Sequence, residues 1–344
     1  MRAHRDEARD PPQEPAGMPA REAPLHASVI VCTFNRAESL ARTVDCLARQ
    51  DVPPATRWEV VVVDNNSRDT TRAVVEEVRR GWPILRYESE PRQGLSHARN
   101  HGIGVARGEI LLFTDDDVCP EPDWVRRILE GMAQHGCDAC GGYIAPDWEV
   151  PPPAWLTERF YGFLAVRTDR TDTYRITSLS EAPFGANMAF RRATLERFGG
   201  FDVTRGRKGN VLSSGEDGEL FERLMGEGAT VMFFGDAKVH HRVEGFRVTK
   251  RYFRRWRFQT SRNIAQSRGM PGDRRLFGIP LYLFPQLLRA CMNAVKARFT
   301  EPPDEALYRE MIVCHFLGTM SGLMRTPRHG ASSDPIAARE EEPR

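Results

Sequence analysis

The sequence lacks several features that would place it quickly in a class of proteins. Its 49 basic residues are nearly balanced by 47 acidic ones, so its overall charge does not indicate a nucleic-acid-binding protein. The apolar run at residues 276–285 is broken by prolines and is too short to span a bilayer, which takes about 20 apolar residues. Residues 1–24 have no apolar middle region, so we expect no export signal there.

The sequence also lacks the cysteine arrangements that are typical of disulfide-rich or zinc-binding proteins. Their number, seven, is odd, and Cys32, Cys46 and Cys314 fall inside expected strands or helices. This suits free thiols in a reducing cytosol better than a disulfide framework. Cys137 and Cys140 form a single C-x-x-C without a second pair at zinc spacing, so we expect two ordinary thiols.

What the sequence does contain is a regular alternation of short apolar runs with helical patterns. This alternation predicts an α/β protein with a doubly wound, largely parallel central sheet and right-handed crossovers. The expected strands are residues 27–33, 58–64, 84–87, 108–114, 184–192 and 230–234.

The most informative stretch is 108–118, an apolar run that ends in three consecutive aspartates, residues 115–117. In open α/β sheets the ligand crevice lies at the carboxyl ends of the strands, where Thr33, Asn35 and Asp64 are also expected. Adjacent carboxylates repel one another, and a divalent cation with oxygen ligands would relieve that repulsion. A solvated acidic turn or helix N-cap is the alternative, and this stretch alone does not decide between them.

A dinucleotide-binding site is the obvious competitor for such an edge. Its glycine fingerprint is missing, because residues 33–36 contain no glycine and residues 102–108 miss the G-x-G-x-x-G spacing by one residue. A carboxylate-rich, glycine-poor edge favours a nucleotide held through base contacts and a metal-bridged diphosphate.

Two later features carry charge or metal-ligating groups. Glu216 and Asp217 follow a glycine at the start of an amphipathic helical pattern, where they could simply complement the helix dipole. His240 and His241 follow the expected strand at 230–234, and a lone histidine is commonly an ordinary surface or core residue.

Together these pieces resemble the GT-A-fold glycosyltransferases of family 2, from about Ser28 to about Val243. The order of several motifs carries the resemblance, since any one of them would be weak. The motifs are V-I-V-C-T-F-N-R (29–36), V-V-D-N-N-S (62–67), Gly94 with A-R-N (98–100), F-T-D-D-D (113–117), G-A-N-M-A-F (185–190), G-G-F-D (199–202), G-E-D (215–217) and the histidine pair.

The resemblance implies a set of site residues, grouped by role. Those expected to hold the nucleotide are Thr33, Asn35, Arg36, Asp64, Arg99, Asp115 and Asp116. Asp117 would bind Mg²⁺ or Mn²⁺, together with His241 or, failing that, His240. Glu216 and Asp217 resemble the family's acidic pair, in which the aspartate is the general base.

The activity implied is inverting transfer from a nucleotide sugar, most simply a UDP-sugar, to a hydroxyl acceptor in a glycan, polysaccharide or glycoconjugate. Arg251 stands where processive family members carry the glutamine of Gln-x-x-Arg-Trp, which favours a single addition. A sugar-1-phosphate nucleotidyltransferase is an alternative, but it should show a basic, glycine-rich loop after the first strand. A non-enzymatic membrane- or nucleic-acid-binding module would leave both acidic clusters unexplained.

The remaining third is basic, with nine lysines and arginines between residues 242 and 268 against one acid. Its aromatic residues suggest either a lipid-facing helix or a solvated basic face with the aromatics in the core, and no RNA-binding motif accompanies them. We expect disordered tails at 1–24 and 326–344, a catalytic domain at 25–245, and a helical extension at 246–325. Peripheral membrane contact through residues 246–324, a lipid-linked acceptor and a cytoplasmic location at the inner membrane face complete the expectation; no nucleic-acid partner is expected.

Overall fold

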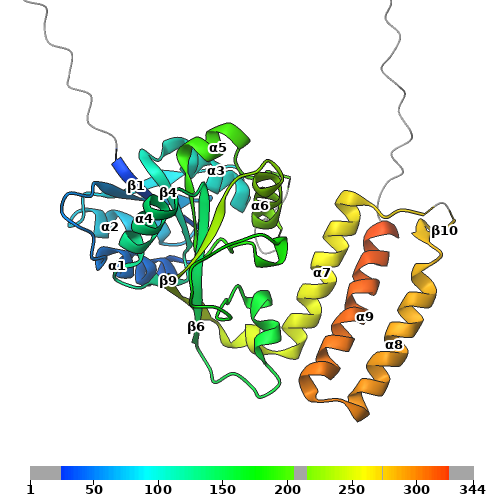
Figure 1. Cartoon of the computed structure of the whole chain (residues 1–344). Helices are drawn as coiled ribbons and strands as arrows, with labels where there is room; N and C mark the ends of the chain where they lie inside the picture. The colour runs from blue at the N-terminus through cyan, green and yellow to red at the C-terminus, as the bar shows by residue number, and fades with distance from the viewer. Residues whose placement is uncertain (1–24, 205–214, 273, 325–344) are drawn as a thin grey trace, which may run out of the picture.

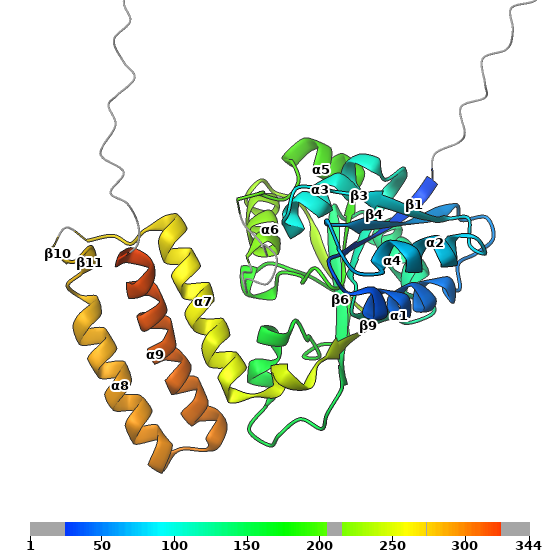
Figure 2. The ribbon, with the colours of Figure 1, turned by 180° about the vertical axis from the view of Figure 1, so that it is seen from behind.

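The computed structural model describes residues 25–204, 215–272 and 274–324. It consists of an α/β part and a layer of three long helices beside it (Figure 1 and, from behind, Figure 2). The tails predicted to be disordered, 1–24 and 326–344, lie outside the described residues, and so do most of residues 203–212.

The first half of the α/β part forms parallel strands as the sequence predicts. The strands are β1 (Leu25–Thr33), β2 (Trp58–Asp64), β3 (Leu85–Ser89) and β4 (Gly108–Asp115), and the helices between them are α1 (Ala37–Ala48), α2 (Thr71–Arg79) and α3 (Leu95–Val105). In the pairing register Thr33 lies beside Asp64, and Cys32 lies beside Asp115. The carboxyl ends of three strands are therefore level, and their polar residues meet at one edge.

The valines of β2 show why this region becomes a sheet covered on both faces. All four, residues 60–63, are fully buried. Val60 and Val62 belong to a core cluster with residues of α1, while Val61 and Val63 belong to a second cluster with residues of α3. Successive side chains of a strand point to opposite faces, so a continuous β-branched run requires helices on both sides.

The second half completes a mixed sheet of order β3-β2-β1-β4-β8-β6-β9-β5, with β7 also paired to β9. Its elements are β5 (Val118–Pro120), α4 (Trp124–His135), β6 (Ala139–Trp148), η1 (Glu158–Leu164), β7 (Tyr174–Arg175), η2 (Leu179–Glu181), β8 (Met188–Arg191), α5 (Arg192–Phe198), α6 (Glu216–Gly226) and β9 (Val231–Val243). The α/β class with a large central sheet is confirmed, with β8 antiparallel to both β4 and β6. The strand predicted at 184–192 begins only at Met188, because the preceding residues form a turn closed by the Asn187 N–H to the Phe184 carbonyl.

The helical extension predicted from the sequence is also present. It contains η3 (Gly245–Val248), α7 (Lys250–Arg268), a hairpin of β10 (Arg275–Leu276) and β11 (Ile279–Pro280), α8 (Leu283–Thr300) and α9 (Pro303–Met324). Helix α9 lies between α7 and α8 (Figures 1 and 2). It packs closely on α7 because Gly318 and Gly322 face backbone carbonyls of α7, with no room for a side chain.

The aromatic residues of α7 belong to the core. Phe253 is fully buried among Phe160 and other aromatic residues of η1, and Tyr252 and Trp256 join the same cluster. Arg254 pairs with Glu310 of α9. Tyr252, Phe253 and Trp256 therefore pack in the core, whereas Phe246 of η3, in the same basic segment, is 62% exposed. Within the described residues, no helix is both long and apolar enough to cross a membrane.

One expectation about cysteine is wrong. Cys46 of α1 and Cys119 of β5 are joined by a disulfide, whereas we expected Cys46 to be a free thiol. The two residues are 73 apart in sequence, but α1 packs beside β5 and brings their Cα atoms to 5.4 Å. The spacing of the two cysteines in the sequence does not indicate this tertiary contact. Cys137 and Cys140 are buried and form no disulfide.

Asn187 connects four elements in the interior. Its side chain is fully buried, donates hydrogen bonds to the carbonyls of Tyr143 and Ala237, and accepts one from Trp124 Nε1 at 2.9 Å. The asparagine of the G-A-N-M-A-F motif thus joins β8 to β6, β9 and α4.

We expect Asn187→Ala to lower the free energy of unfolding by at least about 3 kcal/mol, because three buried polar groups lose their partner. Urea unfolding would measure the change. Asn293→Ala, at an exposed position of α8, is the matched control and should stay within about 0.5 kcal/mol of the parent. An equal effect of both substitutions would contradict this role for Asn187.

Candidate active site

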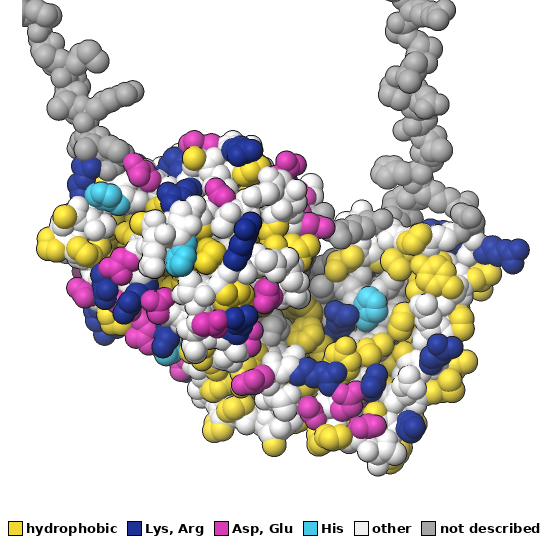
Figure 3. Space-filling view, in the orientation of Figure 1, with side chains coloured by type: hydrophobic (Ala, Val, Ile, Leu, Met, Phe, Trp, Pro, Cys, Tyr) yellow, Lys and Arg dark blue, Asp and Glu magenta, His cyan; other side chains and the backbone are white. Residues whose placement is uncertain are grey.

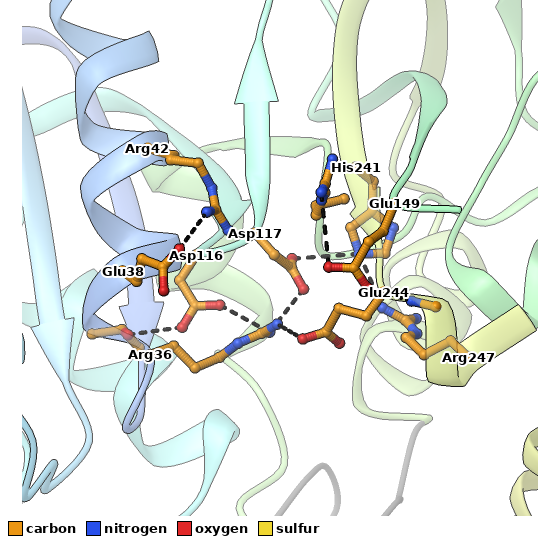
Figure 4. A network of polar contacts seen from close by, with 12 residues as sticks. Arg36, Glu38, Arg42, Asp116, Asp117, Glu149, His241, Glu244 and Arg247 are labelled. Atoms are coloured by element: carbon orange, nitrogen blue, oxygen red, sulfur yellow. Dashed lines mark hydrogen bonds and ion pairs between the residues drawn. The ribbon is translucent and has the colours of Figure 1, made fainter. Parts of the chain in front are cut away.

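The three aspartates lie where β4 ends and the chain turns into β5. Asp115 is the last residue of β4, and Val118, the first of β5, pairs with His241 of β9. The acidic stretch is therefore held between the parallel half of the sheet and β9. Figure 4 shows Asp116 and Asp117 beside Arg36, His241, and Glu244.

Asp116 is bound from the end of β1. Thr33 donates a hydrogen bond from Oγ1 to Asp116 Oδ2 at 2.7 Å, and Arg36 Nη1 lies 3.2 Å from Oδ1. Burial raises the pKa of Asp116 to about 7, although Arg36 opposes the shift. Burial also raises the pKa of Asp115. Gathering these carboxylates therefore costs electrostatic energy unless cations stand beside them.

Asp117 has more positive neighbours than Asp116. Arg36 Nη1 lies 2.8 Å from Asp117 Oδ2, and His241 Nε2 lies 3.4 Å from Oδ1. Burial alone would raise the pKa of Asp117, but His241, Arg36 and Arg247 outweigh it and hold that pKa well below its usual range. Asp117 is the aspartate of the three that stays ionised most readily.

The histidine pair resolves into one inward and one outward side chain. His241 is 3% exposed and faces Asp117, whereas His240 is 43% exposed and contacts Glu121 at 2.7 Å. Alternation along β9 sends the two rings to opposite faces of the sheet. Of the two candidates, the structure brings His241 to the acidic stretch.

The donor set around Asp117 fits a divalent cation. Asp117 Oδ1 and His241 Nε2 lie 3.4 Å apart there, and the other ring nitrogen, the buried Nδ1 of His241, has no hydrogen-bond partner among the described residues. No group of three or more His, Cys, Asp or Glu side chains that could hold a metal occurs in residues 25–204, 215–272 and 274–324. Two protein ligands are nevertheless compatible with Mg²⁺, which takes few side chains and completes its shell with water and substrate phosphates.

Asp64 and Asn35 organise the loops that follow β2 and β1. Asp64 accepts hydrogen bonds from the Ser67 N–H at 2.9 Å and the Tyr87 hydroxyl at 2.8 Å. Asn35 has a positive φ of 53° and accepts a hydrogen bond from the Arg68 N–H at 2.7 Å. Both residues lie at the expected edge. Asp64 fixes its own loop and joins it to β3, whereas Asn35 joins the loop after β1 to the loop after β2.

Arg99 connects the acidic stretch to the second acidic pair. Its guanidinium is 3% exposed and bonds Asp217 Oδ1 at 2.5 Å, with Glu216 at 3.4 Å and Asp115 at 3.7 Å. Burial would lower the pKa of Arg99, but Asp217, Glu216 and Asp115 outweigh it and raise the pKa above its usual value. One buried cation thus joins carboxylates from β4 and α6.

Sequence reasoning missed several residues of this site. The Gly185 N–H donates to Asp217 Oδ2 at 2.9 Å, and a side chain at Gly185 would collide with Arg99. Glu244 accepts from Arg36 at 3.1 Å, and Arg247 Nη1 lies 3.4 Å from His241 Nε2. Gly185 stood in a motif that the resemblance used, but nothing in the local pattern marked Glu244 or Arg247.

A pocket of about 360 Å³ opens next to Phe184, the neighbour of Gly185. Most of the residues that line it lie between positions 158 and 181, outside the motifs named above. The residues that line it include Glu158, Tyr161, Arg167, Glu181 and Phe184.

Glu216 makes the site sensitive to pH. It is 5% exposed, and its Oε2 has no hydrogen-bond partner among the described residues. Burial and the neighbouring Asp217 raise the pKa of Glu216 to about 7. The folded protein therefore holds this proton up to a higher pH than the unfolded chain does.

We expect Glu216→Gln to become progressively more stable than the parent between about pH 4.5 and pH 7 and to keep that advantage above pH 7. The parent loses stability across this window because the buried carboxylate ionises only in the unfolded state, a loss on the order of 2–3 kcal/mol. Urea unfolding from pH 5 to pH 8 would measure it. The exposed Glu227→Gln carries the same charge change, and a parallel trend in that variant would overturn the assignment.

Comparisons with known proteins agree with this geometry. The family model described as Glycosyl transferase family 2 matches residues 28–199. The succinoglycan biosynthesis protein ExoM of Rhizobium meliloti is 30% identical over 240 residues, which cover 69% of this chain and 73% of that protein. The glucosyl-dolichyl phosphate glucuronosyltransferase of Haloferax volcanii is 27% identical over 228 residues, covering 65% of this chain and 71% of that protein.

Two solved structures share the fold. A mannosyltransferase from Pyrobaculum calidifontis, in complex with GDP-Man and Mn²⁺, superposes with a TM-score of 0.58 at 21% identity, covering 88% of this chain and 90% of that one. GalNAc-T7 with UDP, GalNAc and Mn²⁺ gives 0.52 at 20% identity and covers 73% of this chain, which spans about half, 53%, of that longer chain. With its mixed sheet and ordered motifs, the chain belongs to glycosyltransferase family 2 and has a GT-A-like fold.

Proposed function

We propose that this glycosyltransferase moves a sugar, with inversion, from a nucleoside-diphosphate sugar to a hydroxyl acceptor. The observation that carries the proposal is the position of Arg99. It pairs with Asp115 on the nucleotide side and with Asp217 at the start of α6, so the two acidic groups share one site. A displacement reaction needs both acidic groups in one place, because the diphosphate leaves the same anomeric carbon that the acceptor hydroxyl attacks.

Asp217 is the proposed general base. It lies 20% exposed at the rim of the buried cluster, held by the Gly185 N–H and by Arg99, so its position is fixed while part of it stays accessible. A carboxylate there would take the proton of the acceptor hydroxyl as the oxygen attacks the anomeric carbon. Such proton transfer contributes typically about 10²- to 10⁴-fold to the rate. Attack opposite the leaving diphosphate, with one base, inverts the anomeric configuration.

Asp117 and His241 would hold Mg²⁺ or Mn²⁺. Bound there, the cation would offset the negative charge that develops on the leaving diphosphate. Thr33, Asn35, Arg36, Asp64, Arg99, Asp115 and Asp116 are proposed to hold the nucleotide. Arg36 already neutralises Asp116 and Asp117 in the structure, so it keeps this edge compact before a donor arrives.

We propose UDP as the nucleotide and a single addition to a polysaccharide precursor or lipid-linked glycoconjugate as the reaction. Two relatives support the acceptor class, since one is a succinoglycan biosynthesis protein and the other is a glucosyl-dolichyl phosphate glucuronosyltransferase. The pocket beside Phe184 is the proposed place for the acceptor, because Phe184 directly precedes the Gly185 whose N–H holds Asp217. The proposed location is the cytoplasmic face of the membrane. The Cys46–Cys119 disulfide does not support this location, because disulfides are rare in a reducing cytosol.

Two aspartate variants should separate binding from chemistry. Asp117→Asn should abolish metal-dependent UDP binding in calorimetric titration with Mn²⁺, because it removes the charge of the proposed ligand. Asp217→Asn should keep that binding and lose about 10²- to 10⁴-fold in turnover with a nucleotide-sugar panel.

Titration with EDTA in place of Mn²⁺ is the control for metal dependence, and thermal unfolding shows whether each variant remains folded. Unchanged turnover of Asp217→Asn would rule out the assigned base. A UDP affinity that changes neither with Mn²⁺ nor with the Asp117→Asn substitution would rule out the assigned metal site.

A further inference from the structure

Helix α8 carries a row of large apolar side chains that point away from the rest of the protein. They recur every three or four residues, so they lie on one face of the helix. Their exposed fractions are 36% for Phe284, 62% for Leu288, 58% for Met292, 62% for Val295 and 82% for Phe299. Figure 3 shows hydrophobic side chains gathered over this part of the surface.

The inward face of α8 is built from small residues instead. Ala290, Ala294 and Ala297 are buried, as is Leu283 at the start of the helix. Helix α8 packs against α9 and forms the outer edge of the three-helix layer (Figures 1 and 2). A helix on a globular protein ordinarily buries its larger apolar side chains and exposes polar ones. The reversed arrangement here indicates that the outer face meets another apolar phase.

The hairpin that leads into α8 adds to the exposed apolar surface. Phe277, in the turn between β10 and β11, is 82% exposed and has a φ of 51°. Leu276 and Leu281 on either side are 46% and 44% exposed. A phenylalanine in a left-handed turn conformation is unusual. The turn thus presents an aromatic ring to the surroundings just before the apolar face of α8 begins.

The charges of this segment have one sign. Residues 274–300 contain Arg274, Arg275, Arg289, Lys296 and Arg298 and no aspartate or glutamate. Arg275 donates to the backbone carbonyls of Met270, Gly272 and Gly278, so the other four are the cations offered to a surface. Long cationic side chains beside an apolar helix face can rest their stems on it while their charged ends reach phosphate groups. A surface of apolar groups and anions would complement this segment.

We propose that α8 and the β10–β11 hairpin dock on an anionic phospholipid surface, with α8 lying in the plane of the interface. The apolar face would enter the boundary between headgroups and acyl chains, and the cations would meet lipid phosphates. A second copy of the chain fits less well, since a two-fold contact would bring two purely basic segments together. The contact would be made by α8, whereas the basic, aromatic segment of α7 that first suggested a membrane buries Phe253 and neighbouring rings in the core.

This docking would hold the catalytic site beside a membrane. The proposal rests on α8 and the β10–β11 hairpin and on neither the donor nor the acceptor assignment. Flotation of the full chain with phosphatidylcholine vesicles, with and without phosphatidylglycerol, tests it. We expect binding to the anionic vesicles that weakens as ionic strength rises. The combined substitution Leu288→Gln, Met292→Gln and Phe299→Gln should reduce partitioning at least about tenfold, because three side chains lose their favourable transfer to the lipid.

The matched control changes three exposed apolar residues of the α/β part, Val150→Gln, Leu179→Gln and Val203→Gln, and should float like the parent. Binding of UDP by the α8 variant shows that its catalytic part is folded, so loss of vesicle binding is separate from failure of the glycosyltransferase site. Absence of vesicle binding in the parent, or equal flotation of the α8 variant, would overturn the proposal. Light scattering that shows a dimer, converted to a monomer by the α8 variant, would assign the face to a second copy.

Discussion

The structure depends on compensating five carboxylates that the fold gathers at one edge of the sheet. Residues 115–117 arrive on β4 and residues 216–217 on α6, and most of these side chains are buried. Two arginines contact all five, Arg36 from the loop after β1 and Arg99 from α3, and they offset part of the negative charge. Buried charges of one sign are stable only when paired, so this edge is rigid and charged before any substrate binds. That arrangement suits a reaction in which a diphosphate leaves and a hydroxyl loses its proton.

The sheet explains how residues so far apart in sequence meet. Parallel β1, β2 and β4 end level with one another, which places Thr33 and Asp64 at the same edge as the first aspartate. The return strand β9 brings His241 to Asp117, and the turn before β8 brings Gly185 to Asp217. Most of these side chains therefore sit at or just beyond the end of a strand, whereas Arg99 reaches the site from the middle of α3.

Much of this edge could be predicted because strand-end residues follow directly from apolar periodicity. The roles of Asp217 and His241 came from the family resemblance, since a pair of acids at a helix start is equally consistent with dipole complementation. The choice between His240 and His241 needed the structure, because a shift of one residue along a strand reverses the side-chain direction. The Cys46–Cys119 disulfide and the contact between Glu244 and Arg36 could not be predicted, because they join residues that are far apart in sequence and meet only in the folded chain. The exposure of the apolar face of α8 could not be predicted, because apolar periodicity does not reveal which side of a helix the rest of the protein covers.

The most direct test of the account is the stereochemistry of the product. With the donor that a nucleotide-sugar panel selects, proton NMR of the first product formed would report its anomeric configuration. The account predicts the configuration opposite to that of the donor, because Asp217 activates a hydroxyl for a single displacement. A product that retains the configuration of the donor would contradict direct displacement and the role of Asp217 as the base.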